Sequence, residues 1–137
     1  MSDTENAPTA SPVPHLLDVN ALLAAIWVNH PDHKKADIWL QGKQVVTCPL
    51  SELGFLRVST NPRALKSDMQ SARQLLEAFL QKHSAQFLPA DLPALKSKAQ
   101  KSDQVTDHYL ADLASNNGMK LATFDAGIRH SASELIT

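Results

Sequence analysis

Features that mark several classes of protein are scarce or absent in this sequence. The 137 residues include one cysteine, Cys48, so no intramolecular disulfide can form, which suits a reducing compartment. No apolar run approaches the ~18 residues that cross a bilayer, so no membrane association is expected. The N-terminus lacks the basic-then-apolar layout of a secretory signal. The formal net charge of −1 gives no global basic field, so any contact with nucleic acid must be local.

The length is typical of one domain with a single core. Residues 1–13 are polar and rich in proline and are interpreted as a flexible leader, and residues 14–137 as the domain. Apolar runs and helical spacing of apolar residues predict the elements. Strands are expected at residues 13–17, 44–50, 85–90 and 120–125, with an edge strand at 133–137. Helices are expected at residues 21–30, 32–42, 51–58, 67–83 and 106–118, the last with Thr106 as its N-cap; Gly42 and Gly118 are expected to stop two of them.

The order of these elements predicts the fold class. Strands that alternate with helices are typical of a three-layer α/β/α sandwich around a mostly parallel sheet of about five strands. In such sheets the ligand site lies beyond the carboxyl ends of the strands. Four acids fall near that edge. Asp18 and Asp125 end strands, and Glu52 and Asp107 occupy the first turns of helices.

Each acid also has a purely structural interpretation. Asp18 or Asn20 could cap the first helix, and Asp125 could cap a turn. Glu52 and Asp107 could interact with the positive end of a helix, which is worth ~0.3–1 kcal/mol. Considered as a set, however, these acids include carboxylates that follow buried strands, where a charge costs folding free energy unless it has a partner or binds a cation. Mg²⁺ or Mn²⁺ suits a set of carboxylates, whereas zinc is not expected without Cys or His among them.

Three stretches of the chain carry a resemblance. They are LLDVNALLA at 16–24, TCPLSELGFLRVSTNP at 47–62 and QVTDHYLADLASNNGMKLATFD at 104–125. In this combination the chain resembles the PIN-domain ribonucleases, and more closely the VapC-type toxins of bacterial toxin–antitoxin pairs. One departure is the segment KSKAQKSDQ at 96–104, which is richer in lysine than the corresponding stretch in that family.

The resemblance implies a PIN-like fold in which Asp18, Glu52, Asp107 and Asp125 form a catalytic, metal-binding cluster. It implies a cytoplasmic bacterial endoribonuclease that hydrolyses RNA with Mg²⁺ or Mn²⁺. It also implies a homodimer and a cognate VapB-type antitoxin that covers the active site. The alternative is a non-catalytic PIN-like module that binds RNA or protein.

Other polar residues have two interpretations each. Asn20 and Thr123 lie two residues from an acid and are either hydrogen-bond partners of a ligand or ordinary turn and strand residues. Arg57, Arg63 and Arg129 are expected to contact RNA phosphates or an antitoxin carboxylate, or to face solvent.

The remaining expectations concern surfaces. Asp112 is expected at the surface, and no partner is evident for His15 or His130. A solvated face is expected for Lys96, Lys98 and Lys101. A second protomer or an antitoxin helix is expected to pack on the apolar residues of the first two helices, Ile26, Trp27, Ile38 and Trp39.

Overall fold

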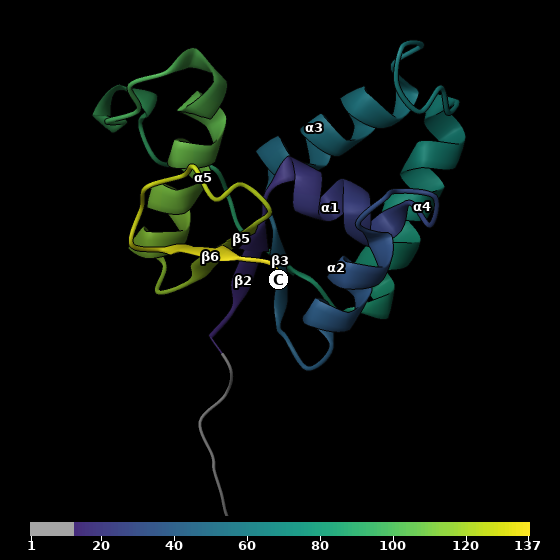
Figure 1. The fold of residues 1–137 in the computed structure, drawn as a ribbon, viewed down its shortest axis with the longest axis horizontal. Coiled ribbons are helices and arrows are strands. Elements are labelled where there is room, and N and C mark those ends of the chain that lie inside the picture. The colour runs from purple at the N-terminus through teal and green to yellow at the C-terminus, as the bar shows by residue number, and fades with distance from the viewer. Residues whose placement is uncertain (1–12) are drawn as a thin grey trace, which may run out of the picture.

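Figure 1 shows the computed structural model of the protein, which describes residues 13–137. The expected leader falls outside these residues except for Val13. The strands are β2 (His15–Leu17), β3 (Val45–Thr47), β4 (Gln86–Phe87), β5 (Lys120–Thr123) and β6 (Ser133–Leu135). The helices are α1 (Val19–Ile26), α2 (His33–Leu40), α3 (Pro49–Thr60), α4 (Met69–Lys82) and α5 (Val105–Asn116), with short 3₁₀ turns η1 (Ala94–Lys96) and η2 (Ser102–Gln104).

The strands form one sheet in the order β4-β3-β2-β5-β6, and every neighbouring pair is parallel. The predicted α/β sandwich is therefore confirmed, with a sheet that is wholly rather than mostly parallel. Strand β2 lies in the middle of the sheet, between β3 and β5. The carboxyl ends of these three strands consequently meet at one edge.

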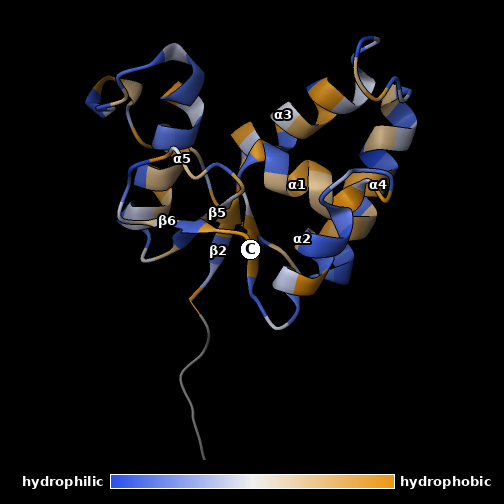
Figure 2. Cartoon of the chain, in the orientation of Figure 1, coloured by the Kyte–Doolittle hydropathy of each residue, from blue (hydrophilic) through white to orange (hydrophobic). Residues whose placement is uncertain are grey.

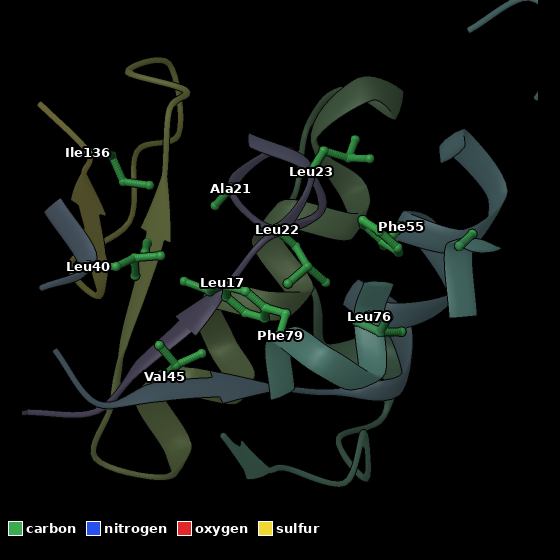
Figure 3. Packing of buried hydrophobic residues seen from close by; sticks show 12 residues of the cluster. Leu17, Ala21, Leu22, Leu23, Leu40, Val45, Phe55, Leu76, Phe79 and Ile136 are labelled. Carbon is green, nitrogen blue, oxygen red and sulfur yellow. The ribbon is translucent and has the colours of Figure 1, made fainter. Parts of the chain in front are cut away.

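Helices cover both faces of the sheet. Figure 1 shows α5 on one side of the strands and α1 to α4 on the other. Because successive side chains on a strand point to opposite faces, Leu17 of β2 faces the core beneath α1 to α4, whereas Leu16 faces the core beneath α5. Val45 and Val46 of β3 divide in the same way. Figure 3 shows the first of these cores, where side chains of the strands meet those of α1, α3 and α4.

Hydrophobic residues concentrate on the central strands and on α1, while the outer turns are largely hydrophilic (Figure 2). Helix α1 is short, but Ala21, Leu22, Leu23 and Ala24 are all buried. This continuous burial places α1 against the end of β2, which fixes the position of the residue between them, Asp18. No helix within residues 13–137 is long and apolar enough to cross a membrane.

Several predicted boundaries were wrong. Thr106 is not an N-cap, because the 3₁₀ turn η2 continues directly into α5 and the cap residue is Gln104. Helix α3 begins at Pro49, since proline is tolerated in the first turn where its missing N–H costs no hydrogen bond. Helix α1 ends at Ile26, and Trp27 adopts an extended backbone. The predicted stops at Gly42 and Gly118 are confirmed, with φ of 77° and 67°.

Candidate active site

The carboxyl edge of the sheet gathers acids from separate segments. Leu17 of β2 pairs with Ala122 of β5, so the next residues along the two strands are Asp18 and Thr123. Asp125 follows two residues later. Parallel pairing therefore brings Asp18 and Asp125 to the same edge although more than 100 residues separate them in sequence.

Asp18 is the most buried of these acids, with 2% of its surface exposed. Its Oδ1 accepts a hydrogen bond from the backbone N–H of Ala21 at 2.7 Å, so the predicted helix cap is confirmed. Burial raises the pKa of Asp18 to about 6, opposed by hydrogen bonds from Thr123 and Ala21 and reinforced by the charges of Asp107 and Asp125. Asp18 therefore caps a helix and also lies among like charges.

Thr123 links two of the acids. Its hydroxyl hydrogen-bonds the Asp18 carboxylate, and its Oγ1 accepts the backbone N–H of Asp125 at 3.0 Å. The Asp125 carboxylate is held in turn by the N–H of Gly127, 2.8 Å from Oδ1. A single buried hydroxyl at the end of β5 thus fixes one acid through its side chain and the other through its backbone.

Glu52 lies at the neighbouring strand end and is anchored separately. Its Oε2 accepts a hydrogen bond from Thr47 Oγ1 at 2.8 Å, and Thr47 is the last residue of β3. The preceding residue, Ser51, donates to the carbonyl of Leu17 at 2.6 Å. Ser51 therefore ties the first turn of α3 to the end of β2, directly beside Asp18.

A close helix crossing reinforces this tie. A Cβ atom on Gly54 would lie 2.3 Å from Cγ2 of Val19, which no side chain at position 54 could tolerate without movement. Val19 follows Asp18, and Gly54 lies two residues after Glu52. The absence of a side chain at position 54 therefore lets α1 and α3 approach closely near the two acids.

Asp107 comes from the other side of the sheet, in the first turn of α5. It is half-buried, and burial, followed by the charge of Asp125, raises its pKa, while His108 opposes this shift. Gln104 Nε2 donates to the carbonyl of Gly127 at 3.4 Å, which connects the start of α5 to the loop that carries Asp125. The structure thus places Asp18, Asp107 and Asp125 near enough to influence one another, whereas Glu52 is held by Thr47 at the end of the neighbouring strand β3.

The donor set fits a hard divalent cation. It consists of carboxylate and hydroxyl oxygens, and Asp18, Asp107 and Asp125 repel one another. As the side chains stand, no three His, Cys, Asp or Glu within residues 13–137 are arranged around a common metal position. Each of Asp18, Glu52 and Asp125 instead accepts a local hydrogen bond. These carboxylates would have to leave their present orientations to share an ion.

Sequence reasoning did not identify Thr47, Ser51, Gln104 or Gly54. The sequence offered a signal for Thr47, because Thr47, like Thr123, ends a central strand. In the structure each of these two residues hydrogen-bonds an acid. The other three act through contacts between segments distant in sequence, which no local pattern reports.

The other residues singled out from the sequence are either exposed or paired with a side chain outside the acidic site. Asn20, Arg57, Arg63 and Arg129 are exposed. Asp112, expected at the surface, is partly covered, and its Oδ1 lies 2.7 Å from His130 Nε2. His15, for which no partner was evident, lies 2.9 Å from Glu134 Oε1.

The two tryptophans are largely accounted for by the fold. Trp27 donates to Ser59 Oγ at 2.8 Å and stacks on Phe55, and Trp39 packs edge-on against His15. Trp27 and Trp39 are therefore partly buried against the core, while Ile38 is exposed.

Comparison with known proteins identifies the family. A model described as PIN domain matches residues 15–133. Ribonuclease VapC38 of Mycobacterium tuberculosis is 40% identical over 121 residues, which cover 82% of this chain and 86% of that protein. Ribonuclease VapC39 of the same organism is 33% identical over 129 residues, covering 86% and 93% of the two chains. With its acids at the carboxyl edge of a parallel sheet, this chain belongs to the PIN-domain family, among the VapC-type proteins.

Proposed function

We propose that the protein is an endoribonuclease that acts as the toxin of a bacterial toxin–antitoxin pair and hydrolyses RNA with Mg²⁺ or Mn²⁺ in the cytoplasm. The observation that carries this proposal is the group of like charges around Asp18. A buried carboxylate whose charged neighbours are Asp107 and Asp125 is costly to the fold, and such a cost is typical of functional sites. The relatives named as VapC ribonucleases support the same activity.

The acids have distinct roles in this proposal. Asp18 and Asp125, at the ends of adjacent strands, would hold the ion directly, and Glu52 and Asp107 would hold it directly or through water. A bound divalent ion would supply a Lewis acid for a phosphoryl oxygen and would lower the pKa of a water molecule. Thr123 would keep Asp18 and Asp125 in register through its two hydrogen bonds.

The chain's own residues also handle the proton and the substrate. Attack by water requires a group that accepts its proton, and Glu52 or Asp107 can do so from the edge of the site. Because water rather than the ribose 2′-hydroxyl attacks, the products carry a 5′-phosphate and a 3′-hydroxyl. Asn20, exposed in the first turn of α1, is proposed to hydrogen-bond a ligand of the ion or the RNA.

The antitoxin partner is proposed to occupy a groove formed by α1, α2 and α4. The groove has a volume of about 320 Å³, and its apolar lining includes Ile26, Val28, Leu75 and Phe79. Ile26 was predicted to face a partner, and its position in this groove supports that prediction. A basic side chain of the antitoxin would reach the acids and compensate their charge.

A homodimer is proposed from a different set of exposed apolar side chains. Leu53, Phe87 and Leu95 are 62%, 55% and 99% exposed, and a second protomer would cover them. Sedimentation of the purified protein tests this proposal, and a monomer at high concentration would contradict it.

RNA cleavage by the purified protein tests the proposed activity. The assay compares Mg²⁺, Mn²⁺ and EDTA at matched ionic strength, and the product ends are identified by ligation and by phosphatase treatment. Metal-dependent products with 5′-phosphates are expected. A protein that binds RNA but does not cleave it under any of these conditions would favour the non-catalytic PIN-like module.

A further inference from the structure

The outer face of α5 carries a hollow surface lined by cationic side chains. One cavity, of about 500 Å³, has Lys96, Lys98, His108 and Arg129 in its lining. A second cavity, of about 400 Å³, shares Lys98, His108 and Arg129 and adds Lys101. Because these cavities have three lining residues in common, they form one continuous surface, named here the basic trough.

The cations of the basic trough outnumber the acids in its lining. Lys96, Lys98, Lys101 and Arg129 are exposed, and none of them forms a salt bridge with any residue in the range 13–137. The acid in the lining of the larger cavity is Asp112. In a chain whose net charge is −1, four unpaired cations at one place create a local positive field.

Asp112 is already engaged, which leaves the four cations free. His130 Nδ1 accepts the backbone N–H of Ala132 at 3.0 Å, so the hydrogen-bond network assigns the ring proton to Nε2. This Nε2 donates to Asp112 Oδ1 at 2.7 Å. Asp112 thus serves to attach the loop at Arg129 and His130 to α5.

The other side of the trough is attached equally firmly. The hydroxyl of Tyr109 donates to the carbonyl of Leu92 at 2.7 Å and accepts the N–H of the same residue at 3.1 Å. This pair of bonds holds the chain before Lys96 against α5. The chain is therefore attached to α5 at Leu92, before the lysines, and at His130, directly after Arg129.

The trough leads to the acids at the carboxyl edge. Gly127 lines its smaller cavity, and the N–H of Gly127 holds Asp125. Asp107 directly precedes His108 in α5. A phosphate cut at the acids must have its neighbouring phosphates on the adjoining surface, and on this side that surface is cationic.

We propose that the basic trough binds the phosphodiester backbone of the RNA strand beside the bond that is cut. This inference rests on the proposed ribonuclease function and names the path of its substrate. The acids alone repel a polyanion, so cations next to them are needed to draw the strand in and fix its register. An acidic segment of a protein partner is the competing occupant, and the test below distinguishes it.

The test measures binding of a single-stranded RNA of mixed sequence in EDTA, over a range of salt concentrations. The trough variant carries Lys98→Gln and Arg129→Gln. The control carries Lys34→Gln and Lys35→Gln, which remove the same charge from exposed positions on α2. A third variant, Lys98→Arg with Arg129→Lys, keeps the charge. Matching melting curves establish that all are folded.

The slope of log affinity against log salt is expected to fall by about 1.4 in the trough variant, because each lost phosphate contact on a single strand removes about 0.7. The control and the charge-keeping variant should retain the parent slope. An equal slope in the trough variant and the parent would overturn the proposal even if the parent cleaves RNA. Loss of inhibition by the antitoxin with an unchanged RNA slope would also overturn it, in favour of a protein occupant. Reduced RNA binding in the trough variant, without cleavage by the parent, would instead retain the trough and reject the ribonuclease function.

Discussion

The two ends of strand β2 bury charge in opposite ways. At the start, His15 is 5% exposed, its Nε2 lies 2.9 Å from Glu134 Oε1, and Trp39 packs against the ring. At the end, Asp18 is 2% exposed, but its charged neighbours are Asp107 and Asp125, which carry the same sign. The amino end of the strand thus places a histidine beside an acid, whereas the carboxyl end brings carboxylates of like charge together, which repel one another.

This difference separates structural from functional burial of polar groups. A buried titratable group that serves the fold usually has a partner of opposite charge, because desolvation without one is costly. Asp18 has hydrogen bonds from Thr123 and Ala21 but no cationic side chain among the groups that shift its pKa. In the proposed function, a cation from solution would supply this missing partner.

The largest expected effect is on catalysis at the carboxyl end. Asp18→Asn keeps the shape and the helix cap but loses the ligand charge, so RNA cleavage should fall more than about a hundredfold, beyond the loss typical of residues that only support a metal ligand. Asp125→Asn should behave alike. Asp91→Asn, an exposed acid distant from the site in sequence, serves as the control. Asp18→Asn or Asp125→Asn with parental activity would remove that acid from the site.

The same substitution should stabilise the metal-free protein near neutral pH. The pKa of Asp18 is raised to about 6 in the folded state, so the charge of this group costs stability, by about 3 kcal/mol at pH 7. The contribution of Asp18 to folding stability is fully present below the pKa that this group has in the unfolded chain. It is lost as the pH rises through about 6, the pKa in the folded state. In EDTA at pH 7, Asp18→Asn should therefore unfold at a higher denaturant concentration than the parent. The difference between the two unfolding midpoints should decrease toward pH 4. The effect of Asp107→Asn on stability should have the same sign and be smaller. A variant less stable than the parent at pH 7 would show that the acid is structural.

An effect of intermediate size on stability and on RNA cleavage is expected at the crossing of α1 and α3. Gly54→Ala places a methyl group against Val19 and should cost about 1–3 kcal/mol of stability and reduce cleavage, because α3 carries Glu52. The double variant Gly54→Ala, Val19→Ala makes room for the new methyl and should recover part of both losses. Additive losses in the double variant would mean that this contact does not set the distance between the helices.

The smallest effect is expected at the amino end of β2. Glu134→Gln keeps a hydrogen-bond acceptor for His15 and removes only the charge of a partly exposed carboxylate, so stability should fall by less than about 1 kcal/mol. RNA cleavage should be unchanged, since this pair lies at the opposite end of the strand from the acids. Denaturant unfolding and the cleavage assay check both statements. A large loss of cleavage would break the distinction between the two ends.

Local patterns predicted the elements that depend on local chemistry. Apolar runs identified β2, β3 and β5, and the left-handed glycines Gly42 and Gly118 identified two helix ends. The start of α5 was missed because a 3₁₀ turn continues into it without a capping side chain. The placement of Asp18 and Asp125 at one edge followed from the parallel sheet alone.

Pairs distant in sequence could not be predicted. His15 and Glu134 are 119 residues apart, and His130 and Asp112 meet only because the last loop packs on α5. Lys96, Lys98 and Lys101 were expected to form a solvated face, and Arg129 to contact phosphates or an antitoxin carboxylate or to face solvent. Their position in one trough was not predicted, because the lysines belong to one segment and Arg129 to another. The hydrogen bonds of Tyr109, His130 and Gln104 hold these segments around α5.

The central claim is that the acids of the carboxyl edge are an incomplete cation site, and thermal unfolding with and without metal tests it most directly. The melting temperature of the parent is measured in EDTA and in millimolar Mg²⁺ or Mn²⁺ at matched ionic strength, beside Asp18→Asn. Because a ligand that binds only the folded state stabilises it by about 2.7 kcal/mol at 100 times Kd, the parent should melt at clearly higher temperature with metal. Asp18→Asn should start higher in EDTA and lose most of the response. A parent whose melting is independent of metal, or an Asp18→Asn variant that responds as the parent does, would contradict the account.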